Sequence, residues 1–128
     1  MVTRNAQIVA AIRRLKGRWR SDATKTMSRW VFPKRIAGAR MKMWKQLFGK
    51  NEWRITATRI YGEFEGNKSV STYRVIWADE WSAMLVLRDS SGERAYHVFF
   101  DEPWFYLLAG RDIVEYFRRV PVQRRGSA

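Results

Sequence analysis

Apolar side chains recur with a helical period near the start of the chain, and the pattern predicts a helix over residues 4 to 15. Thr3 or Asn5 can cap its start, and Gly17 can end it because glycine accepts the positive φ that a helix stop often needs. The apolar stripe falls at i, i+3, i+4 and i+7: Ile8, Ala11, Ile12 and Leu15.

This first segment also carries arginines and no acidic residue, a composition that is typical of organelle transit peptides. It runs directly into a tryptophan-bearing strand pattern without an obvious cleavage region. We therefore expect a basic N-terminal helix, residues 1–15, that packs on the domain.

A second helical pattern covers residues 34 to 48, between Pro33 at a favourable first position and Gly49 as a stop. One half of its wheel is apolar. The helix could be a surface for anionic lipid or a nucleic-acid backbone, and the favoured interpretation is a helix that covers a barrel with its cations in solvent. Those cations occupy the other half of the wheel: Lys34, Arg35, Lys42 and Lys45.

From residue 51 onward the pattern changes to alternation with period two. Segments 52–61, 70–78, 82–88, 94–100 and 104–110 read as strands, joined by turns at 62–67 and 89–92. Residues 17–24, and also 26–32, add to the count. Residues 112–120 fit a helix and a strand equally well.

These strands, six to eight in number, predict a mainly β fold that is an antiparallel up-and-down barrel, since closure removes exposed strand edges. The length of 128 residues fits one domain with one core. We expect a single domain over 1–128, with the barrel at 16–120 and a flexible tail at 121–128.

The order of elements resembles that of lipocalins and their calycin relatives: a short basic helix, Gly-x-Trp on the first strand, then a meander of about eight strands. "GRW" at Gly17 to Trp19 is similar to their motif. The resemblance implies that Gly17 permits a tight turn at the closed end of the barrel and that Trp19 plugs that end. It also implies an arginine from a late strand stacked on the indole, for which Arg118 or Arg119 could serve. Lipocalin-like barrels bind small ligands, so the resemblance implies that function too.

A cavity in such a barrel would suit a small apolar or amphipathic ligand, and an anionic group on that ligand would suit Arg59 and Arg74. The other residues that we expect to line the cavity are large and mostly aromatic: Trp53, Tyr61, Tyr73, Trp77, Met84, Tyr96, Phe100 and Phe105.

The net charge of +13 lies entirely in residues 1–50, which hold 14 basic residues and one acidic residue, Asp22. The alternative function is therefore docking of this segment onto nucleic acid, an anionic membrane surface or an acidic protein. Solubility alone could also explain the charge. The docking cations would be Arg13 and Arg14 on the first helix with the four of the second helix.

Candidate chemistry is sparse, so we predict no enzyme and no cofactor. His97 is the only histidine and there is no cysteine, which leaves no metal site beyond a single axial haem ligand. Glu63 and Glu65 are spaced to share a strand face, as solvated strand residues also are. The absence of cysteine fits a reducing compartment, and we expect a cytoplasmic protein.

Overall fold

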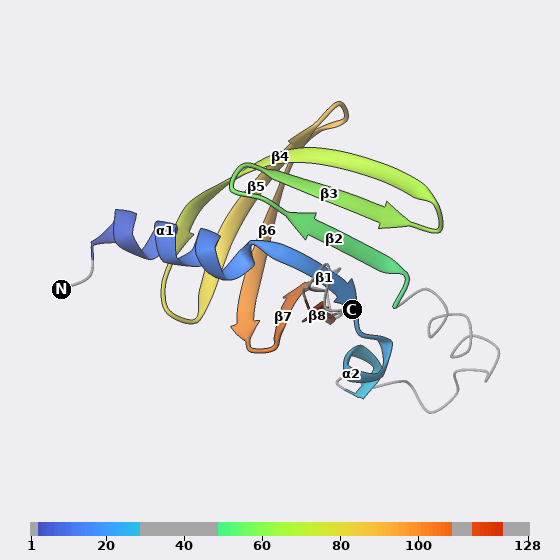
Figure 1. Ribbon diagram of the computed structural model, residues 1–128. Coiled ribbons are helices and arrows are strands. Elements are labelled where there is room, and N and C mark those ends of the chain that lie inside the picture. The colour runs from blue at the N-terminus through green and yellow to red at the C-terminus, as the bar shows by residue number, and fades with distance from the viewer. Residues whose placement is uncertain (1–2, 29–48, 109–113, 122–128) are drawn as a thin grey trace, which may run out of the picture.

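The computed structural model describes residues 3–28, 49–108 and 114–121, and these form a closed antiparallel barrel of eight strands (Figure 1). Each strand pairs with the next along the chain, and β8 returns to pair with β1, where Trp19 lies opposite Arg119. The predicted fold class is confirmed. The strands are β1 (Gly17–Ser21), β2 (Asn51–Ile55), β3 (Arg59–Phe64), β4 (Asn67–Ala78), β5 (Ser82–Asp89), β6 (Gly92–Asp101), β7 (Trp104–Leu108) and β8 (Val114–Arg119).

Helix α1 (Arg4–Leu15) has the predicted bounds and lies across the end of the barrel where β1 begins. Thr3 caps it, because its hydroxyl accepts a hydrogen bond from the backbone N–H of Ala6 at 3.2 Å. Ala11 and Leu15 are fully buried against the barrel. The Arg4 guanidinium donates a hydrogen bond to the carbonyl of Ile76 on β4 at 2.8 Å, which attaches the first turn of α1 to the barrel.

Helix α2 (Ala23–Ser28) replaces the end of the strand predicted at 17–24 and the start of the strand predicted at 26–32, whose remaining residues lie outside the described ranges. The Asp22 carboxylate accepts from the backbone N–H of Lys25 at 3.0 Å, which is the capping bond of a helix start. The chain therefore leaves the barrel after Ser21 and returns at Asn51. The helix predicted at 34–48 and most of the predicted tail lie outside the described residues.

Two short turns place strand boundaries at other residues than the sequence predicted. The segment predicted as one strand over 52–61 is a hairpin, because β2 ends at Ile55, β3 begins at Arg59, and Ile55 lies opposite Ile60. The next turn is tight, with Glu65 and Gly66 both at positive φ, so β4 begins at residue 67. The turn at 89–92 is confirmed, and residues 114–119 are strand, not helix.

Aromatic rings fill the half of the barrel next to α1, which we call the closed half. Trp19, Phe105 and Phe117 are fully buried. The Trp19 and Phe105 rings meet edge to face at 4.6 Å between centroids, and the Phe105 and Phe117 rings stack at 5.0 Å. Trp53 adds a ring 4.8 Å from that of Phe117. This half is a packed core.

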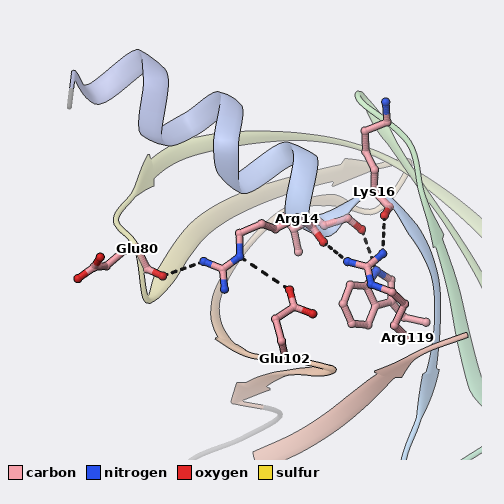
Figure 2. A network of polar contacts seen from close by, with 7 residues as sticks. Arg14, Lys16, Glu80, Glu102 and Arg119 are labelled. Carbon is pink, nitrogen blue, oxygen red and sulfur yellow. Dashed lines mark hydrogen bonds and ion pairs between the residues drawn. The ribbon is translucent and has the colours of Figure 1, made fainter.

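Arg119 joins α1 to the barrel, and Figure 2 shows its guanidinium below the end of the helix. The guanidinium carbon lies 4.3 Å from the centre of the Trp19 ring. Its nitrogens donate to the carbonyls of Arg14 and Lys16, while the Trp19 indole N–H donates to that of Leu15 at 2.7 Å. Carbonyls of the last helical turn have no partner within the helix, so these bonds satisfy them.

Gly17 is required by the same contact. Its φ of +132° favours glycine, and a Cβ there would stand 2.8 Å from a guanidinium nitrogen of Arg119. Of the two arginines that the resemblance offered, Arg119 stacks on Trp19, whereas Arg118 alternates to the outer face.

We predict that Arg119→Ala lowers the free energy of unfolding by about 2 kcal/mol, since it removes a cation–π contact and charge-assisted hydrogen bonds. The neighbouring Arg118→Ala is the matched control and should change stability by less than about 0.5 kcal/mol, because that side chain is exposed. Urea unfolding of both variants measures the difference. Equal effects would contradict the role given to Arg119.

Candidate functional site: the open half of the barrel

The half of the barrel away from α1, which we call the open half, has small side chains on part of its inner face. On β3 and β4 the inward-facing positions include Gly62, Ser69 and Ser71, all small residues. A Cβ on Gly62 would stand 2.7 Å from the Ser69 hydroxyl and 3.8 Å from atoms of the Trp53 ring, so these side chains face one inner space. Ser69 is nevertheless solvent-exposed. Solvent therefore reaches the wall at this point, where Gly62 and Ser69 also line a hollow of about 280 Å³.

Apolar surface borders this opening. Phe64 lies two positions after Gly62, on the same inner face of β3, and is half-buried, as is Trp53. On β6, Tyr96 is half-buried and packs against the core. Half-buried aromatic rings beside an opening are surfaces on which the apolar part of a small molecule could lie.

A buried carboxylate also faces inward in this half. Glu115 on β8 has only 7% of its surface exposed, and it accepts a hydrogen bond from the Ser21 hydroxyl at 2.8 Å. The Ser21 oxygen in turn accepts from the backbone N–H of Gly49 at 3.1 Å. Burial raises the pKa of Glu115, while hydrogen bonds from Ser21 and Asn51 oppose that rise.

Sequence reasoning missed Glu115 because 112–120 fitted a helix as well as a strand. The usable signal was the alternation of Glu115, Phe117 and Arg119, which places all three on the inner face once the segment is read as a strand.

Five of the predicted cavity residues do face inward, at different depths. Phe105 is buried in the packed closed half. Phe100 lies under the Arg14 guanidinium, 3.9 Å from it, at the α1 end. The Tyr73 hydroxyl donates to the carbonyl of Thr56 at 2.6 Å, and burial raises the pKa of Tyr73 to about 12. Only Trp53 and Tyr96 of this group border the open half.

The other five predicted cavity residues point outward, which corrects the sequence prediction. The hairpin between β2 and β3 restarts the alternation, so Ile60 is buried and its neighbours Arg59 and Tyr61 face out. Arg74 is exposed between the buried Tyr73 and Val75.

A β-bulge accounts for Trp77, and ordinary alternation between the buried Ala83 and Leu85 accounts for Met84. The pairing of β4 with β5 shifts between Val75 and Trp77, so that Trp77 lies opposite Met84 on the outer face and is 42% exposed. Because Arg59 and Arg74 are outside, they give no reason to expect an anionic group on an interior ligand.

The two docking cations predicted on α1 differ in whether the barrel already binds their side chains. Arg13 is exposed. Arg14 is held by the barrel: it donates to the carbonyl of Glu80 at 2.7 Å and lies 3.8 Å from the Glu102 carboxylate (Figure 2). Its side chain fixes the helix and is not free for a partner. The docking cations at 34, 35, 42 and 45 lie outside the described residues.

The remaining candidates for chemistry have structural partners. The His97 Nε2 lies 2.9 Å from the Ser82 hydroxyl, which resembles a nucleophile and its base. Ser82 is only 4% exposed. In a catalytic triad the acid contacts the histidine and orients it, whereas here the Asp79 carboxylate contacts the Ser82 hydroxyl at 3.4 Å. Glu65 bonds to Lys50 at 2.7 Å and does not pair with Glu63.

No protein-family model, curated protein or solved structure matches the chain. The closed eight-stranded meander is consistent with a calycin-like fold. Among the helices in the described ranges, none is long and apolar enough to cross a membrane.

We predict that Glu115→Gln stabilises the protein at neutral pH and that this gain disappears in acid. Because the folded-state pKa of Glu115 is raised, the contribution of this group to stability is fully present below the ordinary glutamate pKa of about 4.3 and is lost as pH rises through the raised value. Thermal melting from pH 3 to pH 8 measures the stability difference between Glu115→Gln and wild type, with substitution of an exposed residue, Glu63→Gln, as control. A variant that is less stable than wild type throughout the range contradicts the assignment.

Proposed function

We propose that the protein is a non-enzymatic, lipocalin-like barrel that binds a small amphipathic molecule in its open half. One observation carries the proposal: the inner wall at Ser69 is solvent-exposed although it faces the half-buried ring of Trp53. A closed barrel with no binding role has no need of an opening onto aromatic surface, because exposing such surface costs about 25 cal/mol per Å².

The chemistry of the open half indicates what kind of molecule fits. Its apolar part would lie on Trp53, Phe64 and Tyr96. Its polar group would be a hydrogen-bond donor or a cation, because Glu115 is a buried carboxylate on the inner face. Arg94 occupies an inner-face position of β6 in the same half, but its guanidinium is paired with the Asp89 carboxylate at 2.7 Å. A carboxylate accepts about four hydrogen bonds, and those from Ser21 and Asn51 leave capacity for a ligand donor.

The alternative, docking of residues 1–50 onto a polyanion, has weaker support on α1, where Arg14 is committed to the barrel. The interior site instead draws on residues from β1 to β4, β6 and β8, which only the folded barrel brings together.

Calorimetric titration with octylamine, octanol and octanoate, all below micelle-forming concentrations, tests this function. We expect saturable binding in the order amine, alcohol, carboxylate, with about tenfold between the amine and the carboxylate. Glu115→Gln should remove the preference for the amine while binding of the alcohol remains.

A matched pair of variants tests the location. Ser69→Trp places a large ring in the opening and should reduce binding at least tenfold, whereas Val70→Trp places it on the outer face of the same strand and should have no effect. Equal melting temperatures would show that both variants fold. Binding that survives Ser69→Trp, or no binding of any probe to wild type, would refute the proposal.

A further inference from the structure

Four arginines gather on the outer face of β8, β1 and β2, and we call them the arginine quartet: Arg18, Arg20, Arg54 and Arg118. The strand register sets them side by side, with Arg18 opposite Arg54 and Arg20 opposite Arg118. All four are exposed, and the side chains of Arg18 and Arg20 have 64% and 63% of their surface in solvent.

This arrangement is electrostatically unfavourable in the isolated protein. Directly opposed residues of like charge on neighbouring strands destabilise a sheet. Glu52 offsets part of the repulsion, since its carboxylate lies 3.6 Å from Arg18 and 3.4 Å from Arg20. Within the described residues, neither Arg54 nor Arg118 makes an ion pair. Bound anions would relieve the repulsion that remains.

Two hollows flank the quartet, and each contains one of its opposed pairs. A hollow of about 280 Å³ holds Arg18 and Arg54 beside Tyr61. A larger one, of about 760 Å³, holds Arg20 and Arg118 beside Pro103 and Val120. Six cations and three carboxylates line the two together: Arg18, Arg20, Arg54, Lys68, Arg118 and Arg119, with Asp22, Glu52 and Glu63.

Aromatic rings lie at both ends of this face. Tyr61 lies beside Arg54 in the sheet, with its ring centre 4.1 Å from the guanidinium. Trp104 lies beside Arg118, and its indole N–H donates to the Asp22 carboxylate at 3.0 Å, which fixes the ring. Flat bases stack on such rings and on guanidinium planes.

We propose that this face binds single-stranded nucleic acid, with phosphates on the arginine quartet and bases in the two hollows. A duplex keeps its bases stacked inside and would leave the hollows unused. A membrane surface is less favoured because interfacial docking requires apolar side chains that insert. Exposed large apolar residues of the described ranges lie mainly elsewhere, on α1 and near the end of β4: Val9, Ile76, Trp77 and Trp81, with Val70 alone on β4 near Tyr61.

Fluorescence anisotropy with labelled 12-nucleotide RNA and DNA strands tests the proposal. Four neutralised phosphates predict a slope of log K against log salt of about −3. An abasic strand of the same length carries the same phosphates without bases and should bind at least tenfold more weakly. The RNA and DNA arms show which strand is preferred, and a duplex and phosphatidylserine vesicles are the competing partners.

The double variant Arg54→Glu/Arg118→Glu should weaken binding at least tenfold, and Tyr61→Ala should reduce the advantage of the normal strand over the abasic one. Arg74→Glu is the control, since it reverses an exposed charge on β4 outside both hollows. The double variant should melt no lower than wild type at low salt, because its new carboxylates face Arg18 and Arg20. That result separates lost binding from lost folding.

Three results would overturn the proposal: equal binding of normal and abasic strands, tighter binding of vesicles or duplex, or an equal loss in Arg74→Glu. Of the interior-site variants, Ser69→Trp alters a residue that lines the smaller hollow, whereas Glu115 lines neither hollow. Glu115→Gln should therefore leave strand binding unchanged, which distinguishes failure of one proposal from failure of the other.

Discussion

The guanidinium of Arg119 lies between the indole of Trp19 and the final carbonyls of α1, and the architecture depends on this contact. It joins three parts of the molecule: the first strand, the last strand and the helix that precedes them. Because β8 must reach β1 to make it, the contact forms only when the barrel closes. It also satisfies backbone groups that α1 would otherwise leave unpaired beside an apolar core.

This contact divides the barrel into two halves with different properties. Toward α1, the rings of Trp19, Phe105 and Phe117 are fully buried and lie in direct contact with one another. Toward α2, small residues, a buried carboxylate and an exposed inner wall replace them. Stability is thus concentrated at one end, and the other end can expose aromatic surface without opening the fold. The division explains how a packed core and the proposed binding site can share so small a barrel.

Much of the fold was predictable because long alternating segments and one capped helix carry strong local signals. The failures arose where a single residue changes the phase of a strand. Thr56 to Thr58 form a turn without glycine, proline or asparagine, and the bulge beside Trp77 has no sequence mark. Each shift exchanges the inner and outer faces for the rest of the strand in which it occurs. Glu115 was missed because its segment fitted a helix as well as a strand. The opposed arginines were hidden for a different reason, since their pairing depends on the register of strands distant in sequence.

The structure also divides the basic residues into groups that the sequence alone did not distinguish. Part of the N-terminal excess fixes structure, as Arg14 does, and part gathers with Arg54 and Arg118 from later strands. The central claim remains the contact of Trp19 with Arg119, and a double-mutant cycle of Trp19→Phe and Arg119→Gln tests it most directly. We expect a coupling free energy of about 1 kcal/mol or more. Additivity within about 0.3 kcal/mol would show that the two side chains act independently, and would contradict this account.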